Sequence, residues 1–312
     1  TAGRLDINGG YLQCGIITVG RGNGSASTAP TGLVSVLRIN GGVIQSGGIY
    51  AGLQLNDMGG APCNARPLVE MNGGTHIGTQ LLLGNAAIPV QPKVLFNGGF
   101  TAFTGPASGD VRLAYDGGVT SETVVAGGTL AVSNVLIRIA DNSAAAKAVV
   151  RLNGGTLITR GFERLGSGVG EVYFNGGVLQ PCQSFTLSNL TVAAVQAGGF
   201  AVNVPTGMTL TVTQALTHDA ALGATPDGGL VKWGSGALVL GGAQSYTGPT
   251  AISGGVLRVT GTLTVTNLAL ASGVTLSLTN GACQVFAPAA LALGGAGDPV
   301  RVTSYEPVVK NG

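Results

Sequence analysis

Short segments of alternating apolar and polar residues recur along the first two thirds of the chain, and each ends at an Asn-Gly-Gly tripeptide or its Asp-Gly-Gly variant. The residues one and three positions before the tripeptide are large and apolar or aromatic in every copy, whereas the residue between them varies. This period of two predicts a β-strand with one buried and one solvated face. The tripeptides begin at Asn8, Asn40, Asn72, Asn97, Asp116, Asn153 and Asn175.

A second alternating segment follows the glycines of most copies, as at 11–13, 43–45, 156–158 and 178–180. Each repeat is therefore predicted to form a strand, a corner and a second strand. Asn-Gly between strands is also a hairpin signal, and a run of hairpins would give a sandwich or a propeller. Because the inward residues are alike in every copy, stacking of equivalent positions is favoured instead. We predict an all-β parallel β-helix (β-solenoid) of about 12 rungs, with about 25 residues per rung and protruding loops.

Stacked rungs would align equivalent residues in columns. The residues directly before the tripeptides are expected to form the core column, which contains Ile7, Ile39, Met71, Phe96, Tyr115, Leu152 and Phe174. The first residues of the tripeptides are expected to form a ladder of hydrogen-bonded side chains at the corner. Asp6, Arg38 and Glu70 share one outward position, so neighbouring rungs would carry charges of alternating sign.

The composition excludes several protein classes. Glycine accounts for 55 of 312 residues, hydrophobic residues for 45%, charged residues for 9%, and the net charge is +2. Disordered chains are poorer in apolar residues and more highly charged, and collagen needs a strict three-residue glycine period. No apolar run is long enough to span a membrane, and no basic stripe indicates a nucleic-acid partner.

Four cysteines, Cys14, Cys63, Cys182 and Cys283, include no C-x-x-C pair, so a zinc knuckle is not expected. They are either buried thiols or members of one or two disulfides, and three connectivities are open. The chain begins without methionine or a signal peptide, which is typical of a processed form or a fragment.

Residues able to carry chemistry are sparse and scattered. The acids are dispersed along the sequence, and no nucleophile elbow, zinc-protease motif or phosphate-binding loop occurs. His76 stands where other copies have Leu or Ile, which predicts either a shift of register or a partly buried ring. The adjacent His218 and Asp219 need not form a dyad. Trp233 is expected to pack. We therefore predict no enzymatic activity, no metal and no cofactor.

Residues 232–259 resemble the autotransporter-associated β-strand repeat of bacterial surface proteins. The matching residues are Gly234, Gly236, Leu238, Leu240, Gly242, Tyr246, Thr247, Gly248, Thr250, Ile252, Gly254, Gly255 and Leu257. The resemblance implies a right-handed β-helix passenger, exposed at the bacterial surface or outside the cell, and supplies no catalytic residues. The expected organisation is a solenoid with Asn-Gly-Gly corners over 1–204, its continuation with this repeat over 205–299, and a terminal strand or tail over 300–312.

The functional expectation follows from the ends of such a solenoid. Leu5 and Ile7 already belong to a standard repeat, and no capping segment precedes them. We therefore expect a non-enzymatic extracellular structural protein whose copies stack head to tail into a bacterial surface filament or matrix. The alternatives are an adhesin or stalk-like passenger, with surface glycans or other cells as partners, and a polysaccharide-active β-helix enzyme.

Overall fold

The computed structural model describes residues 3–20, 34–53, 66–85, 90–105, 111–115, 117–141, 143–263, 267–278, 290–293 and 301–304. The chain divides into two compact units. Unit 1 comprises Thr1–Tyr173 and Asn189–Val192, and unit 2 comprises Phe174–Ser188 and Ala193–Gly312. The division predicted after residue 204 follows the last Asn-Gly-Gly repeat and stays a prediction.

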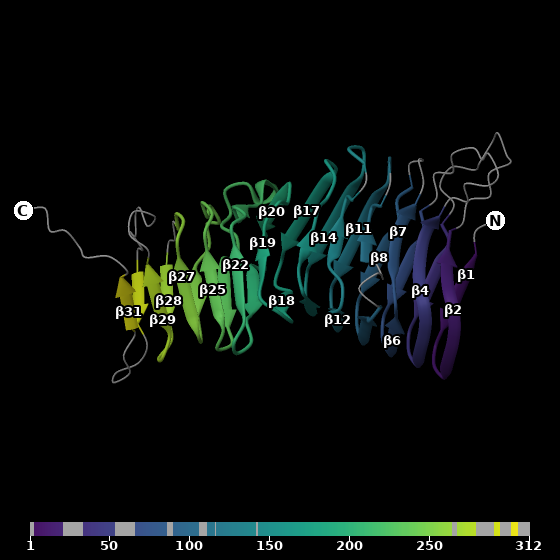
Figure 1. The fold of residues 1–312 in the computed structure, drawn as a ribbon, viewed down its shortest axis with the longest axis horizontal. Helices are drawn as coiled ribbons and strands as arrows, with labels where there is room; N and C mark the ends of the chain where they lie inside the picture. Colours follow the sequence, from purple (N-terminus) through teal and green to yellow (C-terminus); the bar gives the residue numbers. More distant parts are fainter. Residues whose placement is uncertain are drawn as a thin grey trace, which may run out of the picture. The chain divides into compact units, whose positions relative to one another are not determined.

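Unit 1 consists of short strands that lie side by side along the chain (Figure 1). They are β1 (Arg4–Ile7), β2 (Tyr11–Val19), β3 (Val36–Ile39), β4 (Val43–Leu53), β5 (Leu68–Met71), β6 (Thr75–Gly78), β7 (Leu81–Asn85), β8 (Lys93–Phe96), β9 (Phe100–Phe103), β10 (Val111–Leu113), β11 (Thr120–Val125), β12 (Thr129–Val132), β13 (Ile137–Ile139), β14 (Lys147–Leu152), β15 (Thr156–Thr159) and β16 (Phe162–Glu163). β17 (Val169–Phe174) reaches the boundary of the unit.

Strands of unit 1 pair with their counterparts in the next rung, and the pairings are parallel. The first strands of the rungs follow the order β1-β3-β5-β8-β11-β14. β4 is long enough to pair with both β6 and β7. From β6 the pairing continues through β9, β12 and β15, and from β7 it continues through β10, β13 and β16. Because each rung thus supplies strands to three faces of a coil, the fold is a parallel β-solenoid, as the repeats predicted.

The corner glycines allow consecutive rungs to approach closely. Gly42 has a φ of +85°, and a Cβ added there would lie 2.6 Å from the carbonyl oxygen of Gly10 in the preceding rung. Only glycine combines this left-handed backbone with the absence of a side chain. The second glycine of the tripeptide is therefore required by the stacking as well as by the turn.

From Ile7 to Leu152, the inward residues share one core column, which differs from the predicted column at one position. Strand register aligns Ile7, Ile39, Met71 and Phe96, and the next residues in the column are Val125 and Leu152. The prediction that Tyr115 belongs to this column is wrong, because the strand that pairs with β8 and β14 is β11, which ends at Val125. Tyr115 lies outside β11, and the Arg112 guanidinium stacks 4.4 Å from the centre of its ring.

Unit 2 is built in the same way (Figure 1). Its strands are β18 (Val178–Pro181), β19 (Phe185–Leu187), β20 (Val192–Val195), β21 (Phe200–Asn203), β22 (Thr209–Val212), β23 (Thr217–His218), β24 (Leu230–Trp233), β25 (Ala237–Leu240), β26 (Thr250–Ile252), β27 (Val256–Val259), β28 (Asn267–Leu270), β29 (Thr275–Leu278), β30 (Ala290–Leu293) and β31 (Arg301–Ser304). One face follows β18-β21-β24-β26-β28-β30, a second follows β19-β22-β25-β27-β29-β31, and β20 pairs with β23.

The described residues contain very little helix. The only helix among the described residues is the short 3-10 helix η2 (Ala220–Leu222), which Asp219 caps by accepting a hydrogen bond from the amide of Ala221 at 3.0 Å. Over the described ranges, the structure contains no helix with the length and apolar character needed to cross a membrane.

Candidate functional site

The corner of unit 1 carries a ladder of asparagine side chains. The Nδ2 atom of Asn40 donates to Oδ1 of Asn8 at 2.7 Å, Asn72 donates to Asn40 at 2.8 Å, and Asn97 donates to Asn72 at 2.8 Å. Each amide therefore donates to the preceding rung, and the interior members also accept from the following one. This arrangement locks rung to rung at the corner.

The next position of the ladder is Ala126. β8 pairs with β11, so the residue after Val125 is the counterpart of Asn97. Asp116, which the sequence placed in the ladder, lies outside the described residues. The corner Ala126-Gly127-Gly128 lacks the Asn-Gly-Gly signature because Ala replaces Asn. The flanking pattern of strand, corner and strand is otherwise intact and was the signal that could have identified it.

The corner position of unit 2 is also polar but varies in residue type. Oδ1 of Asn175 accepts a hydrogen bond from the amide of Gly198 at 2.8 Å. Gln196 occupies the corner position after Asn175, because the backbone N–H of Gln196 donates to the backbone carbonyl of Phe174. Its Nε2 donates to Oδ2 of Asp219 at 2.6 Å. Side-chain hydrogen bonds between rungs therefore occur at the corners of both units.

Charged residues on the outward face of unit 1 pair between rungs. Arg38 lies between Asp6, 3.9 Å away, and Glu70, to which it donates a short hydrogen bond, as the alternating charges predicted. Glu122 likewise bridges Lys93 at 2.6 Å and Arg151 at 2.9 Å. Although partial burial acts to raise the pKa of Glu122, the hydrogen bonds from these two cations bring it below the ordinary value.

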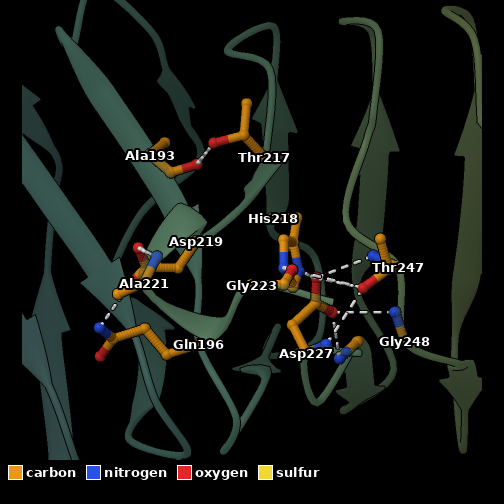
Figure 2. A network of polar contacts seen from close by, with 11 residues as sticks. Ala193, Gln196, Thr217, His218, Asp219, Ala221, Gly223, Asp227, Thr247 and Gly248 are labelled. Carbon is orange, nitrogen blue, oxygen red and sulfur yellow. Dashed lines mark hydrogen bonds and ion pairs between the residues drawn. The ribbon is translucent and has the colours of Figure 1, made fainter. Parts of the chain in front are cut away.

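A cluster of polar contacts in unit 2 surrounds Asp227 (Figure 2). Oδ2 of Asp227 lies 2.9 Å from Nδ1 of His218 and accepts from the amide of Thr247 at 2.8 Å. Oδ1 accepts from the amides of Gly229 and Gly248, each at 2.9 Å. We call these residues, with Gly223, the His218 clamp. The clamp joins the corner at 227–229 to the following rung at 247–248.

Inside the clamp, every group that could perform acid–base or nucleophilic chemistry is already engaged. The Thr247 hydroxyl donates to Asp227 at 3.1 Å and also lies 3.1 Å from Nδ1 of His218. Nε2 of His218 is 3.1 Å from the carbonyl oxygen of Gly223. With both ring nitrogens facing acceptors, the ring has no nitrogen left to act as a base towards a substrate. The geometry is that of a structural clamp.

The charges of the clamp stabilise one another. The hydrogen bond to Asp227 raises the pKa of His218 above its ordinary value, against a smaller opposing effect of desolvation. Burial acts to raise the pKa of Asp227, but hydrogen bonds from Thr247, His218, Gly248 and Gly229 outweigh it, and this pKa is lowered. The carboxylate that pairs with His218 is that of Asp227, not that of the adjacent Asp219. The available signal was the Asp-Gly-Gly corner that begins at Asp227.

Lys232 on β24 points into the core of unit 2 and is fully buried. Its Nζ donates to the carbonyl oxygens of Gly234 at 2.8 Å and Gly254 at 2.7 Å, and to that of Trp233 at 3.4 Å. Desolvation lowers its pKa from 10.5 to about 8. The ammonium thus connects the corner of its own rung to the corner of the next one.

A buried hydroxyl pair lies near this corner. The Tyr246 hydroxyl is 2.6 Å from Oγ1 of Thr250, and burial raises the pKa of Tyr246. The two hydroxyl groups satisfy each other's hydrogen-bonding capacity inside the fold, as the backbone carbonyls do for Lys232.

His76 is buried in unit 1, with 1% of its surface exposed. Register places it inward on β6, between Ile44 and Thr101, in agreement with its alignment to Leu and Ile of other copies. Nε2 lies 3.0 Å from Oγ of Ser46, whereas Nδ1 has no hydrogen-bond partner. Burial lowers the pKa of His76 to about 4.

The cysteines form no common site in the described part of the chain. Cys14 is a half-buried free thiol, and no disulfide joins it to Cys182. Cys63 and Cys283 lie outside the described residues.

Comparison with known proteins identifies one segment. Residues 230–259 match the family of the passenger-associated-transport-repeat, in agreement with the resemblance to autotransporter passengers. No curated protein and no solved structure matches the chain. The matched segment contains Lys232, Thr247 and Gly248, which form hydrogen bonds between consecutive rungs in unit 2. The repeat implies placement at the bacterial cell surface or outside the cell.

Proposed function

We propose that this chain is a non-enzymatic extracellular structural protein, a passenger-type β-solenoid whose copies assemble end to end into a bacterial surface filament or matrix. The observation that carries the proposal is the outer edge of the first rung of unit 1. Within the described residues, β1 and β2 pair only with β3 and β4, so one edge of each strand has no partner.

The same edge exposes side chains that the rest of the solenoid buries. Leu5 is 51% exposed, although its counterpart in the next rung, Leu37, is 1% exposed. Tyr11 and Ile16 of β2 are also exposed. Apolar surface of this kind gains roughly 25 cal/mol for each Å² that is removed from water. A further parallel rung would cover these residues in the way that β3 covers β1.

A structural role is further supported by the polar clusters. The polar groups of the His218 clamp and of Lys232 are engaged within the fold, and some of their hydrogen bonds join consecutive rungs, as those of the ladder at Asn40 do. The alternative of a polysaccharide-active enzyme would need carboxylates free to act on a substrate.

The test is electron microscopy combined with light scattering of the purified chain over a range of concentrations. The wild-type chain is expected to form linear assemblies, and Leu5→Asp is expected to abolish them by placing a charge at the joint. Leu165→Asp is the matched control, because Leu165 lies away from this edge and is, at 64%, even more exposed than Leu5. Monodisperse wild-type monomers at high concentration, or assemblies that persist in Leu5→Asp, would contradict the proposal.

A further inference from the structure

The core of unit 1 holds His76 in a site that accepts only the neutral ring. Nε2 faces the Ser46 hydroxyl at 3.0 Å, and Nδ1 is buried without a partner. Phe103 packs edge-on against the ring at 5.6 Å between centroids. Gly78 completes the site, because a Cβ at that residue would lie 2.9 Å from Cε1 of His76.

Within the part of the chain that the structure describes, no charged group acts on this ring, and desolvation alone shifts its pKa. β4 contributes Ile44 and Ser46, β9 contributes Thr101 and Phe103, and the strand of His76 itself contributes Gly78. An imidazolium donates through both nitrogens, and here only one of them has an acceptor. Adding a proton to His76 would therefore bury an uncompensated charge.

His218 in unit 2 has the opposite environment. Both of its nitrogens face acceptors, the Asp227 carboxylate and the Gly223 carbonyl. The charged groups that act on it are Asp227 and, more weakly, Asp219, and both are acids. Its surroundings therefore favour the imidazolium.

We propose that acidification opens the β-solenoid around His76 in unit 1 while the His218 clamp of unit 2 stays closed. The chain would thus contain a built-in acid response, in which one unit loosens before the other.

The sign of the effect follows from proton linkage. An unfolded histidine has a pKa of about 6.5, whereas burial lowers that of His76 to about 4, so the open state binds more protons between these values. Stability that His76 contributes at neutral pH is lost as the pH falls. Between pH 7 and pH 4.5 the equilibrium constant for opening is expected to rise about 50-fold.

The raised pKa of His218 has the reverse sign. Stability from its charged form is fully present below about pH 6.5 and is lost only as the pH rises through its higher folded-state pKa. Acid therefore leaves the clamp intact until Asp227 begins to protonate. Because the pKa of Asp227 is lowered, that occurs below its ordinary value of 3.8.

Hydrogen–deuterium exchange of the full chain at pH 7.0 and pH 4.5, normalised for intrinsic exchange rates, tests the proposal. Peptides from β4, β6 and β9 are expected to lose protection by about 50-fold at pH 4.5, whereas peptides covering 217–248 retain it. His76→Leu should remove the loss, because Leu130 and Leu157 occupy the same column. His218→Gln should leave the response of unit 1 unchanged.

Unchanged protection of β4, β6 and β9 in the wild-type chain, or an equal loss in His76→Leu, would overturn the proposal. A titration of the ring protons by NMR supplies a second measurement if that variant does not fold. The chain has only two histidines, so His218→Gln assigns both signals. The His76 signal is expected to remain that of the neutral ring above pH 5, and a midpoint near 6.5 would refute the buried neutral site.

Discussion

At the scale of single residues, the solenoid tolerates a few polar groups in its core, and these differ in how well they are satisfied. Lys232 has three carbonyl acceptors, whereas the Thr123 hydroxyl has none. Thr123 points inward from β11 between Val94 and Val150, and it is buried. A buried hydroxyl without a partner costs free energy, so this position offers a direct measurement of that cost.

Thr123→Val is expected to stabilise the chain by about 1 kcal/mol, because valine has the same shape and no unsatisfied hydroxyl. Urea denaturation provides the measurement. Thr123→Ser is the control, since it keeps the hydroxyl and removes a buried methyl group, and it should destabilise the chain. Equal stability of the wild type and the valine variant would mean that the hydroxyl has a partner in solution.

Lys232→Met is expected to destabilise the chain by about 1–3 kcal/mol, because the carbonyl groups of Gly234 and Gly254 lose their donor. The folded-state pKa of Lys232, about 8, lies below its ordinary value of 10.5. Wild-type stability attributable to this group should therefore increase as the pH rises from 8 to 10.5. Urea titrations at pH 7.5 and pH 10 would show this increase, and Lys232→Met should lack it. A parallel response in both proteins would argue against the buried ammonium.

At the scale of strands and corners, each rung is held to the next by backbone pairing and by side chains at equivalent positions. The asparagine ladder joins the rungs of Asn8, Asn40, Asn72 and Asn97 and is interrupted at Ala126. Both the repeat and its interruption lie at an exposed corner. Side chains at this corner can therefore be exchanged with little effect on the core.

Ala126→Asn is expected to extend the ladder from Asn97 to residue 126 and to raise the free energy of unfolding by about 0.5–1 kcal/mol. Asn40→Ala is the opposite change and removes the hydrogen bonds to Asn8 and Asn72, so it should cost about 1–2 kcal/mol. Thermal unfolding of both variants against the wild type would give the two shifts. If both variants shifted the unfolding temperature in the same direction, the ladder hydrogen bonds would not be the cause of the change in stability.

At the scale of the whole molecule, stability is a sum over stacked rungs, each of which buries the face that its neighbours leave open. In unit 2, Phe174 is fully buried and packs against Phe200, with ring centroids 4.3 Å apart. In unit 1, Phe100 belongs to an equally regular strand but faces outward and is exposed. The two phenylalanines therefore separate the effect of burial from that of strand propensity.

Phe174→Asp is expected to destabilise the chain by several kcal/mol, because it buries an unpaired charge and removes an aromatic contact. Phe100→Asp should change stability by less than about 1 kcal/mol. Circular dichroism in urea can compare them. A loss below about 1 kcal/mol for Phe174→Asp would mean that the inward face is assigned wrongly.

The sequence by itself determined the class of fold, the inward and outward faces of the strands and most of the corner ladder. The reason is that repeated rungs bring identical local patterns into register, so that a period of two and a recurring Gly-Gly corner are sufficient. Tertiary structure alone decided which residues meet where the repeat is degenerate. Val125 replaces Tyr115 in the core column because the strand that pairs with β8 is β11. His218 meets Asp227 because the segment between them, which contains η2, brings the two side chains together. Contacts between rungs depend on the length of chain between corners, and this length varies from one rung to the next.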